Sequence, residues 1–149
     1  MEYVRNNQDV MVRMDKGDEI VASLKRLMDE LEIEAGYFQA LGAVDRATVG
    51  IYYLAAKQYK MLDIEGDFEV SSLFGTMSRQ DGEPYIHAHA TIADVVGGRT
   101  YAGHLNEARI SGTLELALRV MPMAWGRTYD EVTGLNLLTF EEPHANPVE

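Results

Sequence analysis

The chain has 149 residues, of which 46% are hydrophobic and 25% charged, which is the size and composition of one globular domain. It contains no cysteine, which excludes disulfides, thiolate nucleophiles and cysteine-ligated zinc and leaves histidine and carboxylate as the strong metal ligands. The formal net charge is −11 and the basic residues are scattered, which argues against non-specific DNA binding because phosphate neutralisation supplies most of that affinity.

The first eight residues lack the apolar core of a secretory signal, and no apolar stretch approaches the roughly 18 residues that a membrane span needs. We therefore expect a cytoplasmic protein without membrane contact. The first elements in chain order are a strand over Asp9–Met14, with alternating apolar residues, and a helix that begins after Asp18, a good N-cap. The helix is predicted from one apolar face, formed by Ile20, Val21, Leu24, Leu27, Met28 and Leu31. Gly36 closes this helix or the loop after it.

From residue 37 on, the pattern is that of strands separated by turns. The predicted strands are Tyr37–Leu41, Thr48–Leu54, Gln58–Glu65, Phe68–Arg79, Tyr85–Val95, Thr100–Leu105, Arg109–Val120 and Leu135–Phe140. Turn signals lie at Val44–Arg46, Gly66–Asp67, Gln80–Pro84 and Gly97–Gly98. A short helical turn is expected within Met121–Tyr129 or Tyr129–Val132.

Short connections favour hairpins, so the sheet should be rich in antiparallel pairs. The sequence predicts one α+β domain over residues 1–149. Its antiparallel-rich mixed sheet is flanked by one main helix and short helical turns, with a core over about 9–140. The polar tail, residues 141–149, carries two prolines and is expected to fray.

Three of the four histidines fall within one predicted hairpin. His87 and His89 are two residues apart on a strand, so they share a face with Cα atoms roughly 6.6 Å apart. If Gly97 and Gly98 are the central pair of the turn, Thr91 faces His104. His104 then lies on the histidine face, diagonal to His89 and within reach of the same ion.

The opposite face of this hairpin is a row of apolar residues, which provides a consistency check. Its members are Ile86, Ala88, Ala90, Ile92, Tyr101 and Leu105. This row is predicted to face the core, so the histidine row faces a cleft or an interface. Single histidines on strands are usually surface or core residues without a ligand, and a lone His-x-His pair is a weak signal. Three histidines on one face favour a metal site.

Neutral imidazoles suit zinc, nickel, copper or iron, and zinc is the commonest of these in such sites. Three protein ligands leave a coordination position for water or a substrate, as in catalytic zinc sites. Metal-assisted hydrolysis also needs a general base. The candidates for this base are Glu107, Asp81 and Glu69, because they lie near the hairpin in sequence. The alternative for each is an ordinary charged residue on the surface. His144, in the tail, is expected to be exposed to solvent, and Trp125 to pack in the core or an interface.

Four segments together resemble the PPC (plant and prokaryote conserved) domain family. They are Phe38–Val44, Gly66–Gly75, Gly82–His89 and Gly103–Leu105, and the similarity extends from about Asp9 to Phe140. Ala102 stands where the family's Gly-Gly-His-Leu signature has its first glycine. The resemblance implies a mixed α/β fold, a homotrimer, and metal ligands at His87, His89 and His104. Plant members carry an AT-hook before the domain, and this chain has none.

Two functional hypotheses follow. The first is a trimeric protein that binds a divalent metal, expected to be zinc, through His87, His89 and His104. Under this hypothesis the protein could be an enzyme that binds a small molecule at the open coordination position of the metal, although the sequence names no substrate. The second is a DNA-associated regulatory or protein-interaction module without catalytic activity. Stoichiometric metal favours the first, and co-purification of a partner favours the second.

Overall fold

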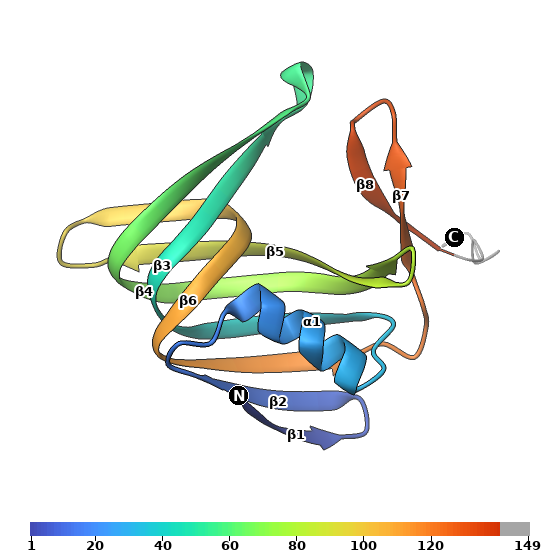
Figure 1. Cartoon of the computed structure of the whole chain (residues 1–149), viewed down its shortest axis with the longest axis horizontal. Helices are drawn as coiled ribbons and strands as arrows, with labels where there is room; N and C mark the ends of the chain where they lie inside the picture. The colour runs from blue at the N-terminus through green and yellow to red at the C-terminus, as the bar shows by residue number, and fades with distance from the viewer. Residues whose placement is uncertain (141–149) are drawn as a thin grey trace, which may run out of the picture.

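The computed structural model describes residues 1–140 and consists of a six-stranded sheet, one α-helix and a separate two-stranded hairpin (Figure 1). The strands are β1 (Glu2–Asn6), β2 (Asp9–Asp15), β3 (Gly36–Tyr53), β4 (Gln58–Gln80), β5 (Glu83–Asp94), β6 (Arg99–Val120), β7 (Gly126–Asp130) and β8 (Leu135–Thr139). The helices are α1 (Ile20–Glu30) and the short 3-10 helix η1 (Leu54–Ala56). The sheet order is β1-β2-β6-β3-β4-β5, and every strand pair in this range is antiparallel.

The protein is therefore predominantly β with one main helix, so α+β describes it loosely, and its sheet is antiparallel rather than mixed. β1, which the sequence did not predict, pairs with β2 at the edge of the sheet. The predicted helical turn after residue 121 is wrong over 126–130, because this segment is β7 and pairs with β8. The tail, with His144, lies outside the described residues. Among residues 1–140, α1 is the longest helix, and neither helix has the length and apolar character to cross a bilayer.

Three strands are much longer than predicted, because β3, β4 and β6 each join two predicted strands. The turn predicted at Val44–Arg46 lies inside β3, where its register with both β4 and β6 shifts between Val44 and Arg46. The turn predicted at Gly66–Asp67 lies inside β4, where Gly66 has a positive φ of 138°. A bulge or a glycine bends a strand without ending it. Residues typical of turns therefore mark bends here.

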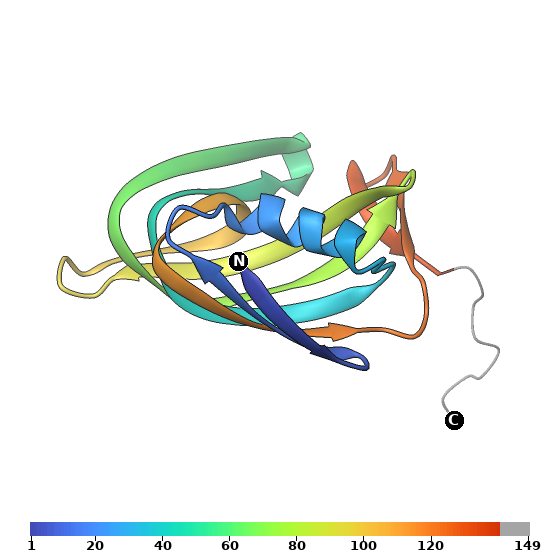
Figure 2. The ribbon, with the colours of Figure 1, turned by 60° about the horizontal axis from the view of Figure 1, so that its bottom comes forward.

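Bending allows β6 to pair twice. Its first residues, 99–104, pair with β5, whereas residues 104–120 pair with β3. Because β3 also pairs with β4, and β4 with β5, these four strands close into a ring. Figure 2 shows the resulting curvature and α1 lying across the sheet.

One face of the sheet, here called the inner face, packs against α1. The predicted apolar side of the helix is confirmed, with Ile20, Leu24, Leu27 and Met28 fully buried. The N-cap is Glu19 rather than the predicted Asp18, because the Glu19 carboxylate accepts hydrogen bonds from the N–H groups of Val21 and Ala22. The Asp18 carboxylate accepts instead from the backbone N–H of Asp15. Glu19 also accepts from Ala108 N–H of β6, which ties the start of the helix to the sheet.

The opposite, outer face of the sheet carries a continuous row of facing residues that leads to the histidines. Residues that face each other across antiparallel strands lie on the same side of a sheet. The row runs across β2, β6, β3, β4, β5 and back to β6 through Met11, Ala117, Gln39, Phe74, His89 and His104. Apolar side chains on this face, including Met11, Tyr37, Leu41 and Phe74, are more than half exposed.

Beyond Gly50, β3 and β4 leave the ring together as an arm, residues 50–62, which ends at η1 (Figure 1). The β7–β8 hairpin stands beside this arm and is joined to it by hydrogen bonds. The Tyr52 hydroxyl donates to the carbonyl oxygen of Thr133 at 2.9 Å, and the Lys57 ammonium donates to the carbonyl oxygen of Glu131. The arm and the hairpin form two walls above the strands that bear the histidines.

Candidate metal centre

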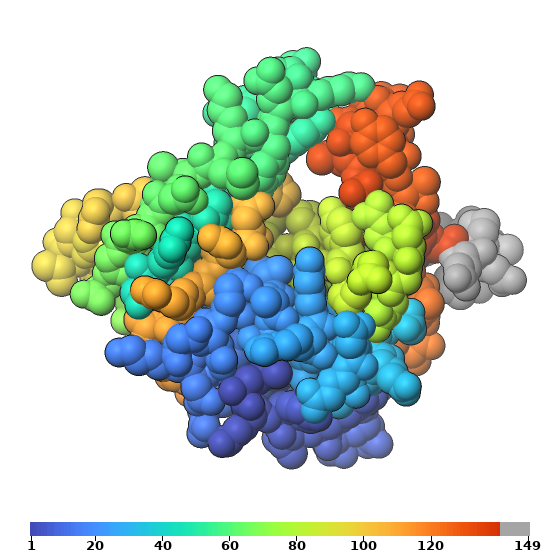
Figure 3. Space-filling view, in the orientation of Figure 1, coloured from blue at the N-terminus to red at the C-terminus, as the bar shows by residue number. Residues whose placement is uncertain are grey.

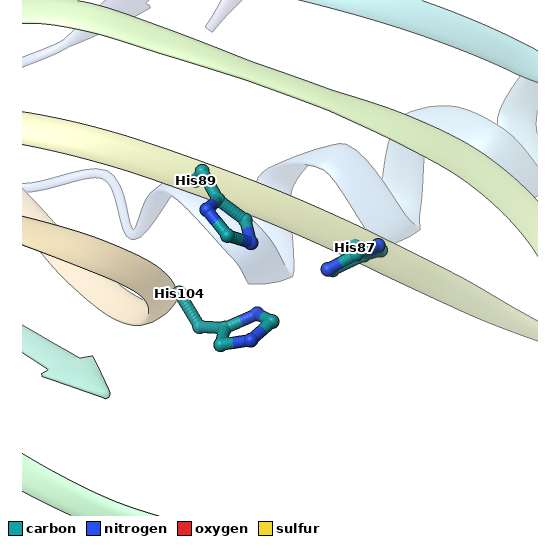
Figure 4. Close-up of side chains that lie close together, drawn as sticks. All are labelled: His87, His89 and His104. Carbon is teal, nitrogen blue, oxygen red and sulfur yellow. The ribbon is translucent and has the colours of Figure 1, made fainter. Parts of the chain in front are cut away.

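The structure brings together the three histidines that the sequence predicted. His87 and His89 extend from β5, and His104 extends toward them from β6 (Figure 4). The ring centroids are 5.3 Å apart for His87–His89, 5.1 Å for His87–His104 and 4.3 Å for His89–His104. Each residue offers a ring nitrogen, and these nitrogens lie within 4.8 Å of one another.

The predicted register of the hairpin is wrong by two residues. His104 faces His89 directly, and Thr91 faces Ala102 rather than His104. The turn has four residues, because Asp94 and Arg99 close it with a salt bridge of 2.8 Å, and the Asp94 carboxylate accepts a hydrogen bond from Gly97 N–H. A shift of two residues leaves every side chain on its predicted face, so the histidine row and the apolar row remain opposite each other.

The three-histidine cluster fits a transition-metal ion. Tetrahedral coordination with metal–nitrogen bonds near 2.0–2.1 Å needs ligand nitrogens about 3.3 Å apart. The ring nitrogens of the three histidines lie within 4.8 Å of one another, and small rotations of the imidazole rings bring them to that spacing. No Asp or Glu within residues 1–140 belongs to the cluster, so the donor set is purely imidazole.

Burial also prepares the cluster for an ion. It lowers the pKa of His87 from the ordinary 6.5 to about 4, with smaller contributions from His104, Arg127 and His89. Burial and the neighbouring His89 likewise lower the pKa of His104. A neutral imidazole has a free lone pair for a metal, so His87 is in its ligating form at neutral pH without first losing a proton.

Two glycines allow the strands to meet closely enough to place the histidines. A Cβ at Gly103 would lie 2.5 Å from the carbonyl oxygen of Gly50, so only glycine fits where β6 passes from β5 to β3. A Cβ at Gly75 would collide with the carbonyl oxygen of His87 on β5. Glycine at these positions is therefore a requirement of the backbone that carries His87 and His104.

Two pockets open next to the cluster. One, of about 450 Å³, lies on the outer face beside His87 and His89, and the Phe74 ring that lines it stacks 6.2 Å from His89. The second, of about 410 Å³, lies between the arm and the β7–β8 hairpin (Figure 3). We call it the Arg127 pocket; its lining includes Tyr52, Tyr59, Tyr85, His87, His104, Asn106, Arg127, Leu135 and Leu137.

Residues that the sequence did not single out close the Arg127 pocket. Tyr59 comes from the arm; its ring lies 5.7 Å from that of His104, and its hydroxyl hydrogen-bonds the Asn106 amide at about 3 Å. Arg127 comes from β7, in a segment expected to be helical. No short-range pattern indicated these residues, because they approach His104 through the folding of distant segments.

None of the acidic candidates for a general base lines either pocket next to the histidines. Glu107 instead faces Thr48 across β3 and β6, with its Oε1 3.4 Å from the Thr48 hydroxyl. Asp81 lies in the turn between β4 and β5, and Glu69 faces Ala93 on β5. All three are exposed. Trp125 is partly buried outside the core cluster, and its Nε1 donates to the carbonyl oxygen of Met77 at 2.9 Å.

Comparisons with known proteins place this geometry in context. The sequence model of the Plants and Prokaryotes Conserved (PCC) domain matches residues 1–122. No curated protein matches the chain in sequence. Among solved structures, a metal-containing protein from Archaeoglobus fulgidus is 30% identical, with a TM-score of 0.82 over 93% of this chain and 96% of its own.

Two further structures are similar over nearly the whole chain. A protein from Bacteroides thetaiotaomicron, provisionally described as DNA-binding, is 27% identical, with a TM-score of 0.89 over 95% of this chain and 98% of its own. A plant- and prokaryote-conserved protein from Pyrococcus horikoshii is 26% identical, with a TM-score of 0.80 over 95% of this chain and 94% of its own.

Proposed function

The chain belongs to the Plants and Prokaryotes Conserved (PCC) domain family, and on that premise we propose that it is a metal-binding protein whose ion is held by His87, His89 and His104. The observation that carries the proposal is the convergence of three imidazoles from two strands, with ring nitrogens within 4.8 Å of one another. The similar protein from Archaeoglobus fulgidus, described as metal-containing, supports it.

The metal that we propose is a divalent transition metal, with zinc as the first candidate. Three imidazoles without thiolate suit zinc, and they leave at least one coordination position for water or a ligand. When bound, such an ion supplies Lewis acidity and lowers the pKa of a bound water molecule. The Arg127 pocket beside the histidines gives a small molecule access to that position. This arrangement favours a small-molecule function, including an enzymatic one.

We further propose that the protein acts as a homotrimer. The outer face exposes Met11, Tyr37, Leu41 and Phe74, which is a large amount of apolar surface for a single soluble chain to leave uncovered. A second and third copy of the chain would bury it. We expect light scattering at micromolar protein to give about three times the chain mass of 16.7 kDa, and a value near 16.7 kDa would contradict the trimer.

A DNA-associated regulatory or interaction role is the alternative, and the similar protein from Bacteroides thetaiotaomicron is the observation that favours it. The net charge of −11 opposes strong binding to phosphates. Mobility shifts on random and A·T-rich duplexes distinguish the two roles. We expect no binding tighter than the roughly 10⁻⁶–10⁻⁴ M typical of non-specific contacts. Nanomolar, sequence-selective binding would instead establish the DNA-associated role.

Elemental analysis of untagged protein tests the metal proposal directly. The wild type should contain about one zinc, nickel, copper or iron ion per chain, whereas His87→Ala, His89→Ala and His104→Ala should contain little. His144→Ala, which changes the fourth histidine of the sequence, is the matched control and should retain the metal. Equal metal content in all four variants, or a wild type that takes up none of these metals, would refute the proposal.

A further inference from the structure

Arg127 carries a partly buried guanidinium, and within residues 1–140 every group that accepts a hydrogen bond from it is neutral. Its Nε donates to the Ser78 hydroxyl at 3.1 Å, its Nη1 to the carbonyl oxygen of Asn136 at 2.9 Å, and its Nη2 to the Thr76 hydroxyl at 3.2 Å. The guanidinium carbon lies 4.5 Å from the centre of the Tyr85 ring, a cation–π contact. These contacts fix the orientation of the guanidinium without neutralising its charge.

No carboxylate within residues 1–140 forms an ion pair with Arg127. Burial lowers the pKa of Arg127, but a guanidinium remains charged at neutral pH. Three of its five N–H groups are engaged by the contacts above, so the contacts within residues 1–140 leave one N–H on each terminal nitrogen. A desolvated charge of this kind is costly unless an anion pairs with it.

The guanidinium lies directly beside the histidine cluster. Thr76, which binds one terminal nitrogen, faces His87 across β4 and β5, and Ser78 faces Tyr85 at the next position of the same face. Arg127, His87 and His104 all line the Arg127 pocket. An anion on Arg127 would therefore lie next to the ion held by the histidines.

The rest of the Arg127 pocket suits an apolar or aromatic molecule. Its walls include Tyr52, Tyr59, Tyr85, Leu135 and Leu137, and among residues 1–140 no Asp or Glu contributes to the lining. A volume of about 410 Å³ falls in the range of small-molecule sites. Figure 3 shows the pocket open to solvent between the arm and the β7–β8 hairpin.

We propose that the Arg127 pocket binds a small monocarboxylate with an aromatic or apolar body, and that the carboxylate pairs with Arg127. A planar guanidinium offers two parallel N–H donors that match the two oxygens of a carboxylate. In the metal-free protein, one cation among apolar walls balances one negative charge, whereas a doubly charged phosphate monoester would remain half neutralised in a protein of net charge −11. The proposed contact between the carboxylate and Arg127 does not require a bound metal. Any role of the metal ion in ligand binding rests on the proposed metal function.

Benzoate, benzamide and phenyl phosphate, each titrated by calorimetry into the purified protein, test the proposal. Benzoate and benzamide have the same shape and differ in charge. We expect benzoate to bind at least tenfold more tightly than benzamide in both metal-free and metal-loaded protein, and more tightly than phenyl phosphate in metal-free protein. Arg127→Gln should abolish the preference for benzoate. Arg5→Gln, which changes an exposed guanidinium that also donates to carbonyl oxygens without an ion pair, should preserve it.

Equal affinity for benzoate and benzamide in the wild type, or no binding of either, would overturn the inference whether or not the Arg127 variant folds. Tighter binding of phenyl phosphate than of benzoate to metal-free protein would overturn the proposed carboxylate and favour a phosphate ester instead. Metal content measured on the same samples separates the two proposals. A protein that holds metal but does not discriminate refutes only the Arg127 inference, and a protein that discriminates without holding metal refutes only the metal function.

Discussion

The inner and outer faces of one sheet differ sharply, although the same strands form both. On β3, Phe38 is 2% exposed in the hydrophobic core whereas the adjacent Tyr37 is 53% exposed on the outer face. On β5, Ala88 and Ala90 are buried whereas His87 and His89 alternate with them on the side of the pockets. The inner face stabilises the fold, and the outer face is free to carry chemistry. Substitutions one residue apart should therefore have different consequences.

The largest effect that we expect comes from Phe38→Ala on the inner face. Removing a fully buried aromatic side chain leaves a cavity and should lower the free energy of unfolding by about 3–5 kcal/mol. Tyr37→Ala, one residue away, is the matched control and should cost less than about 1 kcal/mol in the dissociated chain, because water already reaches its ring there. Denaturant unfolding of both variants at a protein concentration low enough to keep the chains dissociated measures this. Equal losses would contradict the division of the sheet into two roles.

His89→Ala should act through the metal alone. An ion that binds only the folded protein at a concentration 100 times its dissociation constant stabilises it by about 2.7 kcal/mol. The variant should lose this increment in metal-loaded samples and unfold like the wild type after chelation. Thr91→Ala, at the next position of the same face of β5, should retain the full increment. A large loss of stability in the chelated His89 variant would mean that the ring serves packing instead.

Gly103→Ala should lower both the stability of the fold and the affinity for metal, because it disturbs the backbone that carries His104. The added Cβ would meet the carbonyl oxygen of Gly50, so β6 must shift away from β3, at about 1–3 kcal/mol. Metal affinity should fall as well, because His104 moves with the strand. Gly112→Ala, on the same strand, is the control, since nothing lies within 4 Å of a Cβ there. Unfolding curves and metal titrations of the pair check both effects, and unchanged metal affinity in Gly103→Ala would contradict the close approach.

The smallest effect concerns pH in the metal-free protein. The pKa of His87 is about 4 in the folded protein and near 6.5 in the unfolded chain, so the unfolded chain binds more protons between these values. The free energy of unfolding should therefore be highest above about pH 6.5 and should decrease as the pH falls toward 4. Solvent near the ring limits the loss to on the order of 1 kcal/mol. The free energy of unfolding, measured from pH 4 to 7, should depend less on pH in His87→Gln than in the wild type. An unchanged pH dependence would mean that other groups cause it.

The histidine cluster was predictable because it depends on strand periodicity, which survives an error of two residues in register. His87, His89 and His104 stayed on one face although the turn was assigned two residues where it has four. The bends near Val44 and Gly66 were not predictable, since a bulge and a turn favour the same residue types. The N-cap was misassigned because Asp18 and Glu19 are both acidic, and only tertiary contacts direct Asp18 to Asp15 and Glu19 to the helix. Arg127 reaches the site by tertiary packing alone.

The three histidines proposed as ligands come from a single hairpin closed by Asp94 and Arg99, and this has a kinetic consequence. Hairpins close in roughly 1–10 μs, long before a strand such as β3 can find its distant partner β6. The ligand set is thus complete in a local element, without waiting for the ring of strands to close. An ion that binds this hairpin would stabilise the transition state as much as the native state. Metal would then accelerate folding and leave the rate of unfolding nearly unchanged.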